Sequence, residues 1–281
     1  MSVSVMLRQA FLALFLATIA TGSYAAASAK AKADFEPTVG QDGKDVVWVP
    51  TSQALVNRML KLAKVTPNDT VIDLGSGDGR TVITAAQIGA KAIGVEYNPN
   101  MVALSKRNAA KAGVGEKAQF VNGDIFEYDF SKASVITLFL LPDLNVKLRP
   151  KILDMKPGTR IVSNSFTMGD WQADRTINVT EKEGCQSYCT AYLWIVPAKV
   201  EGRWKTADGD LVIKQNYQKV SGALERDGKT TQLSNGNLRA DEFTFTAGGA
   251  QYTARVSGDT MKGTVKSGGN SREFTATRVG S

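Results

Sequence analysis

The segment Val71–Arg80, which reads VIDLGSGDGR, decides the fold. Its apolar start predicts a strand over 71–74, its three glycines predict a tight turn, and a helical pattern follows over 80–88. Glycine allows positive φ angles and lets a ligand approach the backbone without a Cβ clash. Because open α/β sheets bind ligands where strands end in such turns, we expect a ligand site here.

Two carboxylates, Asp73 and Asp78, flank this turn and restrict what it can bind. The third glycine comes one residue earlier than in the dinucleotide pattern Gly-x-Gly-x-x-Gly, and paired carboxylates would repel a pyrophosphate. S-adenosylmethionine (SAM) instead carries a sulfonium and an ammonium, so the charges favour SAM over NAD. The candidate cofactor-binding residues of this segment are Asp73, Gly75, Ser76, Gly77, Asp78 and Gly79.

Two further predicted strand ends carry acidic residues. Glu96 ends a strand at about the spacing from the glycine turn at which an acid accepts hydrogen bonds from ribose hydroxyls. Asp124 follows the next strand, where it can accept from the adenine amine while Ile125 packs on the ring. A simple turn aspartate is the alternative for Asp124. Tyr97, next to Glu96, completes the candidate cofactor set.

Strands and helices alternate on both sides of these motifs, which predicts a parallel sheet with right-handed crossovers. Helices are predicted over 52–64, 98–111 and 144–155, strands over 91–96, 118–122, 134–141 and 160–166, and a closing antiparallel pair over 176–182 and 188–197. The fold class is therefore α/β up to about residue 198.

The pattern changes at residue 199. From there to 281, short strand-like runs are separated by Asp-Gly, Asn-Gly, Gly-Asp and Gly-Gly pairs, which are hairpin signals. We expect a small all-β domain, a barrel or sandwich of about eight strands. The predicted organisation is a leader over 1–29, a ligand-binding domain over 37–198 and the β domain over 199–281.

The first 29 residues have the pattern of a secretory signal: Arg8, an apolar run over 10–20, then small residues. The run is short for a membrane span, so the mature chain is expected to have none. The chain is therefore expected to be exported, to a periplasm or outside the cell. An uncleaved inner-membrane anchor is the alternative.

Composition narrows the chemistry. The chain has no histidine, which excludes Ser-His-Asp triads, Cys-His pairs and histidine-ligated metals, so no metal site is expected. Its two cysteines, Cys185 and Cys189, favour a small-loop disulfide in an exported protein. The net charge of +7 suits anionic partners, or solubility alone.

The motifs VIDLGSGDGR, GVEYN, NGDIF and VITLFLLPD, in this order, resemble those of the class I SAM-dependent methyltransferases over residues 45–198. This resemblance implies a Rossmann-like seven-stranded sheet and SAM as cofactor. Val49-Pro50-Thr51, LGSGDGR, Leu141-Pro142 and LRPK are similar to the lysine N-methyltransferase family that includes the mitochondrial ATP synthase c-subunit methyltransferase. The leader and the β tail depart from that family and leave the substrate open.

The resemblance places Pro50, Thr51 and the segment 140–142 near the transferred methyl group. The candidate catalytic residues are Leu141, Pro142 and Asp143. Asp143 is either a base or the N-cap of the next helix. Asn164 and Ser165 are candidates to face the pocket, and Trp171 either closes over substrate or packs on the core.

The sequence therefore predicts a methyltransferase that uses SAM, with protein lysine as the favoured acceptor. A small-molecule or lipid acceptor, and an exported SAM-binding protein without catalysis, are the alternatives. An envelope-associated acceptor fits the leader. The strand end after residue 138 lacks the Asp/Asn-Pro-Pro-Tyr pattern of adenine and glutamine methyltransferases, so no nucleic-acid partner is expected.

Overall fold

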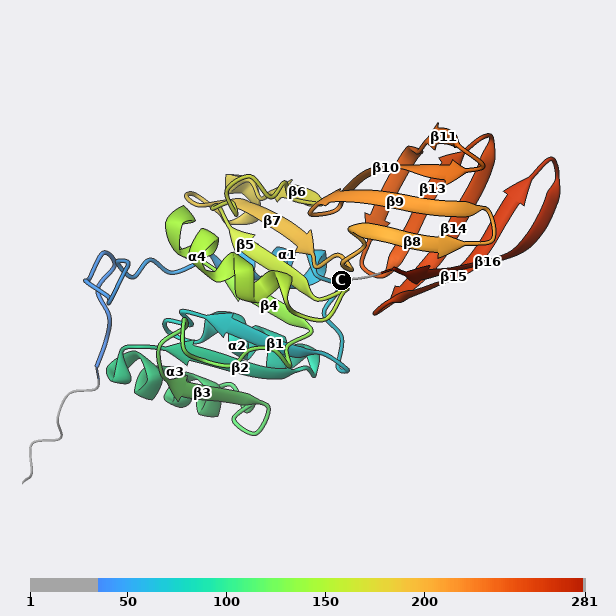
Figure 1. Ribbon diagram of the computed structural model, residues 1–281. Coiled ribbons are helices and arrows are strands. Elements are labelled where there is room, and N and C mark those ends of the chain that lie inside the picture. Colours follow the sequence, from blue (N-terminus) through green and yellow to red (C-terminus); the bar gives the residue numbers. More distant parts are fainter. Residues whose placement is uncertain (1–34, 280–281) are drawn as a thin grey trace, which may run out of the picture. The chain divides into compact units, whose positions relative to one another are not determined.

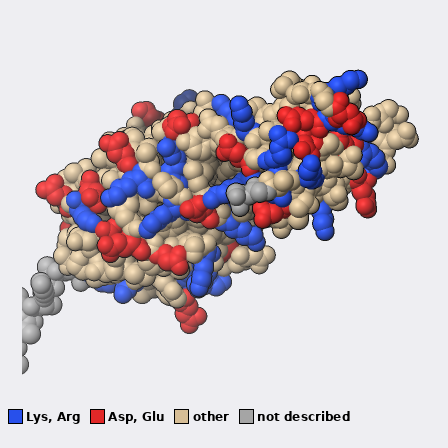
Figure 2. Space-filling model, in the orientation of Figure 1, with Lys and Arg blue, Asp and Glu red and all other residues tan. Residues whose placement is uncertain are grey.

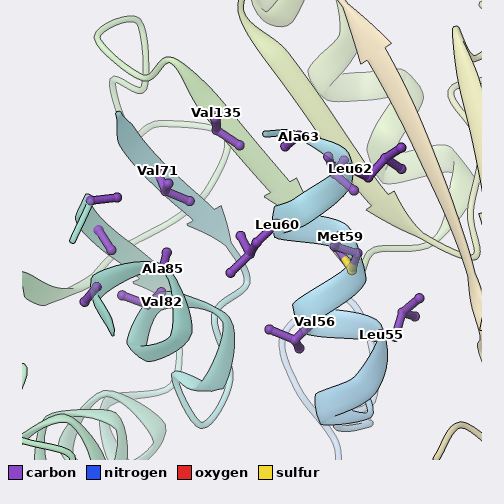
Figure 3. Close-up of a cluster of buried hydrophobic side chains, with 14 of the residues drawn as sticks. Leu55, Val56, Met59, Leu60, Leu62, Ala63, Val71, Val82, Ala85 and Val135 are labelled. Carbon is purple, nitrogen blue, oxygen red and sulfur yellow. The ribbon is translucent and has the colours of Figure 1, made fainter. Parts of the chain in front are cut away.

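The first helix of the protein begins at a serine cap and buries one apolar stripe. In the computed structural model, which describes residues 35–279, the Oγ of Ser52 accepts a hydrogen bond from the Leu55 amide at 3.2 Å. Helix α1 (Gln53–Leu62) follows. Figure 3 shows its Leu60 pointing toward Val71 and Val82, which belong to the same buried cluster.

The elements of the first sheet follow the predicted alternation of strands and helices. They are β1 (Thr70–Leu74), α2 (Arg80–Ile88), β2 (Lys91–Glu96), α3 (Pro99–Lys111), β3 (Ala118–Asn122), β4 (Val135–Leu138), α4 (Pro142–Leu153), β5 (Arg160–Asn164), β6 (Arg175–Asn178), the short 3₁₀ helix η1 (Glu181–Glu183) and β7 (Thr190–Ile195). The seven strands lie in the order β3-β2-β1-β4-β5-β7-β6 (Figure 1). The first five are parallel to one another, and β7 runs antiparallel to both β5 and β6. The predicted antiparallel pair is therefore confirmed.

Helices cover both faces of this sheet. Residues of α1, α2 and α3 share one buried cluster with alternate strand positions such as Val71 and Val135. The intervening positions, such as Ile72 and Ile136, pack with Leu148 of α4 on the other face. Burial on both faces explains why these strands read as continuous apolar runs.

Several predicted boundaries differ from the structure. The strand predicted over 176–182 ends at Asn178, and residues 181–183 form η1. β4 ends at Leu138 and α4 begins at Pro142, because a proline fits the first helical turn, where its missing N–H leaves no bond unmade. The N-cap is Leu141, so the interpretation of Asp143 as N-cap is wrong. β5 ends at Asn164 because Ser165 adopts a left-handed φ of 57°.

The region after residue 201 forms a second sheet, all antiparallel and nearly closed, which confirms the all-β prediction. Its strands are β8 (Gly202–Thr206), β9 (Gly209–Asn216), β10 (Lys219–Arg226), β11 (Lys229–Gln232), β12 (Ser234–Arg239), β13 (Glu242–Ala247), β14 (Ala250–Ser257), β15 (Thr260–Ser267) and β16 (Asn270–Arg278). Their order is β11-β10-β9-β8-β16-β15-β14-β13-β12. Just before β12, the Leu233 amide donates to the Gly222 carbonyl of β10 at 2.9 Å, which brings the two ends of the sheet together.

One predicted hairpin turn in this sheet is wrong. Asn235-Gly236 lies within β12, at a register shift between Ser234 and Asn237, and the turn follows at Ala240-Asp241. A bulge and a hairpin both use positive φ angles, which Asn235 adopts at 52°, so the dipeptide alone does not separate them.

Trp171 packs in the core and does not line the ligand cavity. It is 1% exposed, its Nε1 donates to Gln218 Oε1 at 2.9 Å, and its ring stacks on Tyr217. The Tyr217 hydroxyl in turn bonds Asp170 at 3.0 Å. Trp171 therefore packs on the core, which was one of the two alternatives. Its contacts Tyr217 and Gln218 belong to the turn between β9 and β10.

The predicted leader, residues 1–29, lies outside the described residues. Within residues 35–279, no helix combines the length and the apolar character that a membrane span requires.

Replacing Leu60 with alanine should destabilise the first sheet. The side chain is 1% exposed and its loss leaves a cavity between α1 and the sheet, so we expect about 2–5 kcal/mol less unfolding free energy. Urea unfolding followed by circular dichroism at a helical wavelength reports on this sheet, because all four α-helices of the described residues belong to it. Exposed Lys61→Ala is the control, expected to change stability by less than about 0.5 kcal/mol. Equal midpoints for the two variants would contradict this account.

Candidate active site

A cavity of about 400 Å³ opens at the carboxyl ends of the parallel strands. Its walls come from the glycine turn after β1, from the ends of β2 and β4, and from the segment 41–51 that precedes α1. This is the edge of the sheet at which the sequence predicted a ligand, and the volume is in the range of small-molecule sites.

Three glycines give the turn after β1 its shape. Gly75, Gly77 and Gly79 have φ angles of 82°, 54° and 84°, a region that other residues rarely adopt. A Cβ on Gly79 would stand 2.8 Å from the Phe120 ring, and one on Gly77 would stand 2.8 Å from Trp48 Nε1. Gly75 and Gly77 line the cavity, whereas Gly79 shapes the turn from behind.

Asp73 is the buried carboxylate of the site. It is 6% exposed, and its Oδ1 accepts from the Thr137 hydroxyl at 2.5 Å. Burial raises the pKa of Asp73 to about 7, and the nearby carboxylates of Glu96 and Asp78 also act to raise it, against the lowering effect of the Thr137 hydrogen bond. A cationic group bound beside it would restore the ionised form.

Asp78 is the second carboxylate that the sequence predicted to face the ligand. Unlike Asp73, it is already paired with a cation, Arg80. Arg80 Nη2 lies 2.5 Å from Asp78 Oδ2, and Arg80 Nη1 donates to the Thr51 carbonyl at 2.7 Å. Asp78 lines the cavity and ties the turn to the start of α1. Sequence reasoning gave both aspartates to the ligand and missed Arg80, although it is part of the quoted motif.

Glu96 connects the glycine turn to the end of β2. Its Oε2 accepts from the Gly77 amide and its Oε1 from the Asn98 amide, each at 2.9 Å. The side chain lines the cavity, and each oxygen keeps a second lone pair for a ligand hydroxyl. The prediction that Glu96 accepts from ribose stays a prediction, and Glu96 also fixes the turn.

Asp124, Ile125 and Tyr97 line the end of the cavity that lies over β2 and β3. Lys44 Nζ lies 2.5 Å from Asp124 Oδ2 and 4.8 Å from the centre of the Tyr97 ring. The Lys44 ammonium, together with the Phe126 amide, lowers the pKa of Asp124. An adenine amine that binds here would therefore share the Asp124 carboxylate with Lys44 or displace the Lys44 ammonium from it.

Every residue of the segment 41–51 lines the cavity, whereas the sequence assigned only Pro50 and Thr51 of this segment to the site. It folds back on itself through two 2.9 Å hydrogen bonds, from the Gly40 amide to the Trp48 carbonyl and from the Trp48 amide to the Gln41 carbonyl. Trp48 packs against Gly77. The apolar run Val46–Pro50, with its tryptophan, was the sequence signal for this role.

The opposite end of the cavity is apolar. Its lining residues there are Leu138, Phe139, Leu140, Leu141, Leu144, Phe166 and Tyr188, with Thr51 beside them. Of the three candidate catalytic residues, Leu141 lines the cavity, while Pro142 and Asp143 are exposed on the first turn of α4 and do not line it. The helix carries these two side chains away from the pocket, since its N-cap already lies at Leu141.

Asn164 and Ser165, the other candidates at this end, do not line the cavity. Asn164 is buried, and its Nδ2 donates to the Thr51 hydroxyl at 3.1 Å. It therefore supports a lining residue from behind. Pro50 and Thr51 both line the cavity, where the family resemblance placed them.

The donor and acceptor set fits SAM. Ser76 Oγ is buried with no hydrogen-bond partner among the described residues, and Asp73 offers a carboxylate to an ammonium. Positive-φ glycines leave room for a ligand against the backbone. Acidic side chains for a nucleoside stand at the ends of β2 and β3. This fold and this site define a SAM-dependent methyltransferase.

Comparison with known proteins agrees. The family model described as ANTKMT methyltransferase domain matches residues 73–175. A protein-lysine N-methyltransferase of Saccharolobus islandicus is 43% identical over 154 residues, which are 54% of this chain and 94% of that protein. The chain belongs to the methyltransferase family of this Saccharolobus enzyme.

Other relatives carry different names. The mouse lysine N-methyltransferase named for the ATP synthase c-subunit is 32% identical over 130 residues, which are 46% of this chain and about half (52%) of that protein. A solved structure from Salinibacter ruber, described as an RNA methyltransferase in complex with S-adenosyl-L-homocysteine, is 46% identical with a TM-score of 0.50. It covers 54% of this chain and 96% of that one. These matches leave about half of the chain outside the alignments.

Affinity for the cofactor product S-adenosylhomocysteine should fall at acid pH. Its ammonium is bound best by ionised Asp73, and because the pKa of Asp73 is raised to about 7, binding should be about tenfold weaker at pH 6 than at pH 8. Calorimetry across this range measures the change. In Asp73→Asn the affinity should be low and independent of pH. A wild-type affinity that does not vary with pH would place the ammonium elsewhere.

The raised pKa of Asp73 also makes the stability of the fold depend on pH. Since the folded chain favours protonated Asp73, the contribution of this group to stability is full below its ordinary pKa of 3.8 and is lost as pH rises toward 7. Bound ligand should remove that loss.

Proposed function

We propose that this methyltransferase transfers methyl groups to lysine side chains of proteins. The observation that carries the proposal is the apolar end of the cavity, lined by leucines and aromatic rings. Such a slot suits the aliphatic stem of lysine. The relatives from Saccharolobus and mouse, named as lysine methyltransferases, support the same acceptor.

In this proposal, residues at one end of the cavity bind the cofactor and residues at the other end bind the acceptor. SAM, when bound, supplies a methyl group on a positively charged sulphur, already activated for in-line displacement. Asp73 would hold the amino-acid ammonium, Glu96 the ribose hydroxyls and Asp124 the adenine amine. At the other end, the leucines exclude water, and desolvation lowers the pKa of an entering lysine so that the neutral amine is available.

Thr51 places a hydroxyl at the acceptor end. Its hydroxyl accepts the Asn164 hydrogen bond and is held in place by it. A remaining lone pair on the Thr51 oxygen can accept an N–H from the acceptor amine and orient it. Pro142 and Asp143 have no part in this proposal because they do not line the cavity.

An RNA acceptor is the second candidate, favoured by the name of the Salinibacter protein. On the face of the protein that Figure 2 shows, basic and acidic side chains are interspersed, whereas RNA-binding surfaces gather basic ones. The segment after β4 reads Leu-Leu-Pro-Asp at positions 140–143, without the Asp/Asn-Pro-Pro-Tyr pattern of adenine and glutamine methyltransferases. We therefore favour protein.

An assay with SAM that carries a labelled methyl group distinguishes the possible acceptors. Incubating the enzyme with SAM labelled in the methyl group and an extract of its source cells should label protein, and acid hydrolysis should release methylated lysines. Asp73→Asn is the negative control. Label that is sensitive to ribonuclease would support RNA, and label that partitions into organic solvent would support a lipid or small molecule; either result without methyl-lysine would overturn the lysine proposal.

We also propose that the chain is exported and acts on an envelope-associated protein. The leader pattern over 1–29 supports export, and so does the disulfide between Cys185 and Cys189, because such bonds persist in oxidising compartments.

Export predicts a cleaved product. Fractionation of the source cells should recover the chain outside the cytoplasm, and sequencing its N-terminus should place the cut between residues 20 and 35. A version without residues 1–29 should stay in the cytoplasm. Full-length chain found only in the soluble cytoplasmic fraction would contradict export.

A further inference from the structure

Three aromatic side chains meet at the apolar end of the cavity and belong to none of the buried cores. The ring centres of Phe139 and Phe166 are 6.0 Å apart, those of Phe139 and Tyr188 5.3 Å, and those of Phe166 and Tyr188 6.0 Å. All three line the cavity. Phe139 and Phe166 are half-buried and Tyr188 is 46% exposed, so their rings remain open to a ligand.

The order of the strands puts these rings opposite the nucleoside groups. Phe139 follows β4, Phe166 follows β5 and Tyr188 precedes β7, and these three strands are neighbours in the sheet. Glu96 and Asp124 stand at the ends of β2 and β3, on the other side of β1. A ligand that lies along this edge with its nucleoside over β2 and β3 points its far end at the rings.

The rings have a chemistry that leucine alone would not supply. The face of an aromatic ring carries partial negative charge and attracts ammonium groups, more strongly where water is excluded. Trp171 and Trp194, by contrast, are buried in a core. These three rings are grouped at the cavity without being buried.

A disulfide holds one of the three rings in place. Cys185 is 1% exposed, packs in the core cluster beneath α1, and is bonded to Cys189, the residue after Tyr188. Tyr188 itself has a left-handed φ of 53°. The covalent link therefore anchors a short loop whose exposed member is the cavity-lining tyrosine.

We propose that Phe139, Phe166 and Tyr188 bind the cationic forms of the acceptor side chain, which are the ammonium before it loses its proton and the methylated product, and that the Cys185–Cys189 disulfide positions Tyr188 for this contact. The proposal rests on the proposed lysine acceptor and names the groups that recognise it. Tyr188 contacts the acceptor, whereas the two cysteines act through it as positioning residues.

This site has a consequence for the product. In each round the bound ammonium would first lose a proton to solvent, and the neutral nitrogen would then form an N–C bond as the S–C bond of SAM breaks and S-adenosylhomocysteine leaves. The methylated nitrogen is again positively charged, and after three rounds it is permanently charged. Its attraction to the rings is kept, and its apolar surface grows. The site should therefore accept partly methylated lysine again and give more than one methyl per side chain.

The first test compares a cationic probe with an uncharged analogue of the same shape. The probes are Nα-acetyl-Nε-trimethyl-lysine methylamide and the analogue with a tert-butyl carbon in place of the charged nitrogen, titrated by NMR with S-adenosylhomocysteine present. Wild type should bind the cation more tightly than the neutral probe. Tyr188→Leu should weaken cation binding about 2- to 30-fold, and Tyr188→Phe should retain it. Equal binding of both probes by wild type would overturn the proposal.

The second test separates positioning from general stability. Reducing the disulfide in wild type should weaken cation binding toward the Tyr188→Leu value, and Cys185→Ala/Cys189→Ala should behave the same way without reductant. Reduction should have no further effect on Tyr188→Leu, because the ring it positions is gone. Affinity for S-adenosylhomocysteine should stay unchanged in every variant, as a check of folding. An equal loss on reduction in Tyr188→Leu would overturn the positioning role.

Product analysis links the site to turnover. With the labelled extract, wild type should form di- and trimethyl-lysine, and Tyr188→Leu should shift the products toward monomethyl-lysine with a raised KM. If wild type binds the cation but labels no lysine, the lysine function fails while the ammonium site stands. If it labels lysine but Tyr188→Leu changes neither binding nor products, the function stands and the ring site fails.

Discussion

The buried carboxylate of Asp73 is the constraint on which the site depends. It stands at the end of β1 with a hydrogen bond from Thr137, near two other acidic side chains, and it is almost fully buried. A buried charge without a partner is costly, so the protein surroundings by themselves favour the protonated acid. A ligand cation reverses this balance. The glycine turn, tied to β2 through Glu96 and the Val95 carbonyl, keeps the backbone open where that cation must enter.

The acceptor end depends on elements that are far apart in the sequence. Thr51 precedes α1, Phe139 follows β4, and Tyr188 belongs to the loop closed by the disulfide. The central parallel strands and β7 bring them to one edge, and the Asn164 side chain joins Thr51 to the end of β5. The residues that line the two ends of the cavity thus stand at one edge of the same sheet. In the proposed reaction this sheet would fix the distance between the two reactants and reduce the entropy lost on reaching a productive geometry.

Local patterns were sufficient for most of the fold and for most of the residues that line the cavity near β1, β2 and β3. Periodicity, the Ser52 cap and the glycine turn predicted α1, β1 and α2 closely, since each depends on neighbours in sequence. Pairings at long range were not visible in this way. Neither Lys44 on Asp124 nor the aromatic cluster could be inferred, because their partners are separated by tens of residues. Asp143 was wrongly interpreted as the N-cap because the apolar stripe of α4 begins at Leu144, whereas the helix itself begins at Pro142.

The near closure of the nine-stranded sheet has a consequence for how the protein meets other molecules. The bond from Leu233 to Gly222 brings the last strands of that sheet against each other, which leaves little backbone free for an added strand. A partner cannot easily extend this sheet by β-augmentation, and self-association through unpaired edges is discouraged in the same way. Recognition by this region must therefore rest on side chains of the outer strand faces and on its hairpin loops.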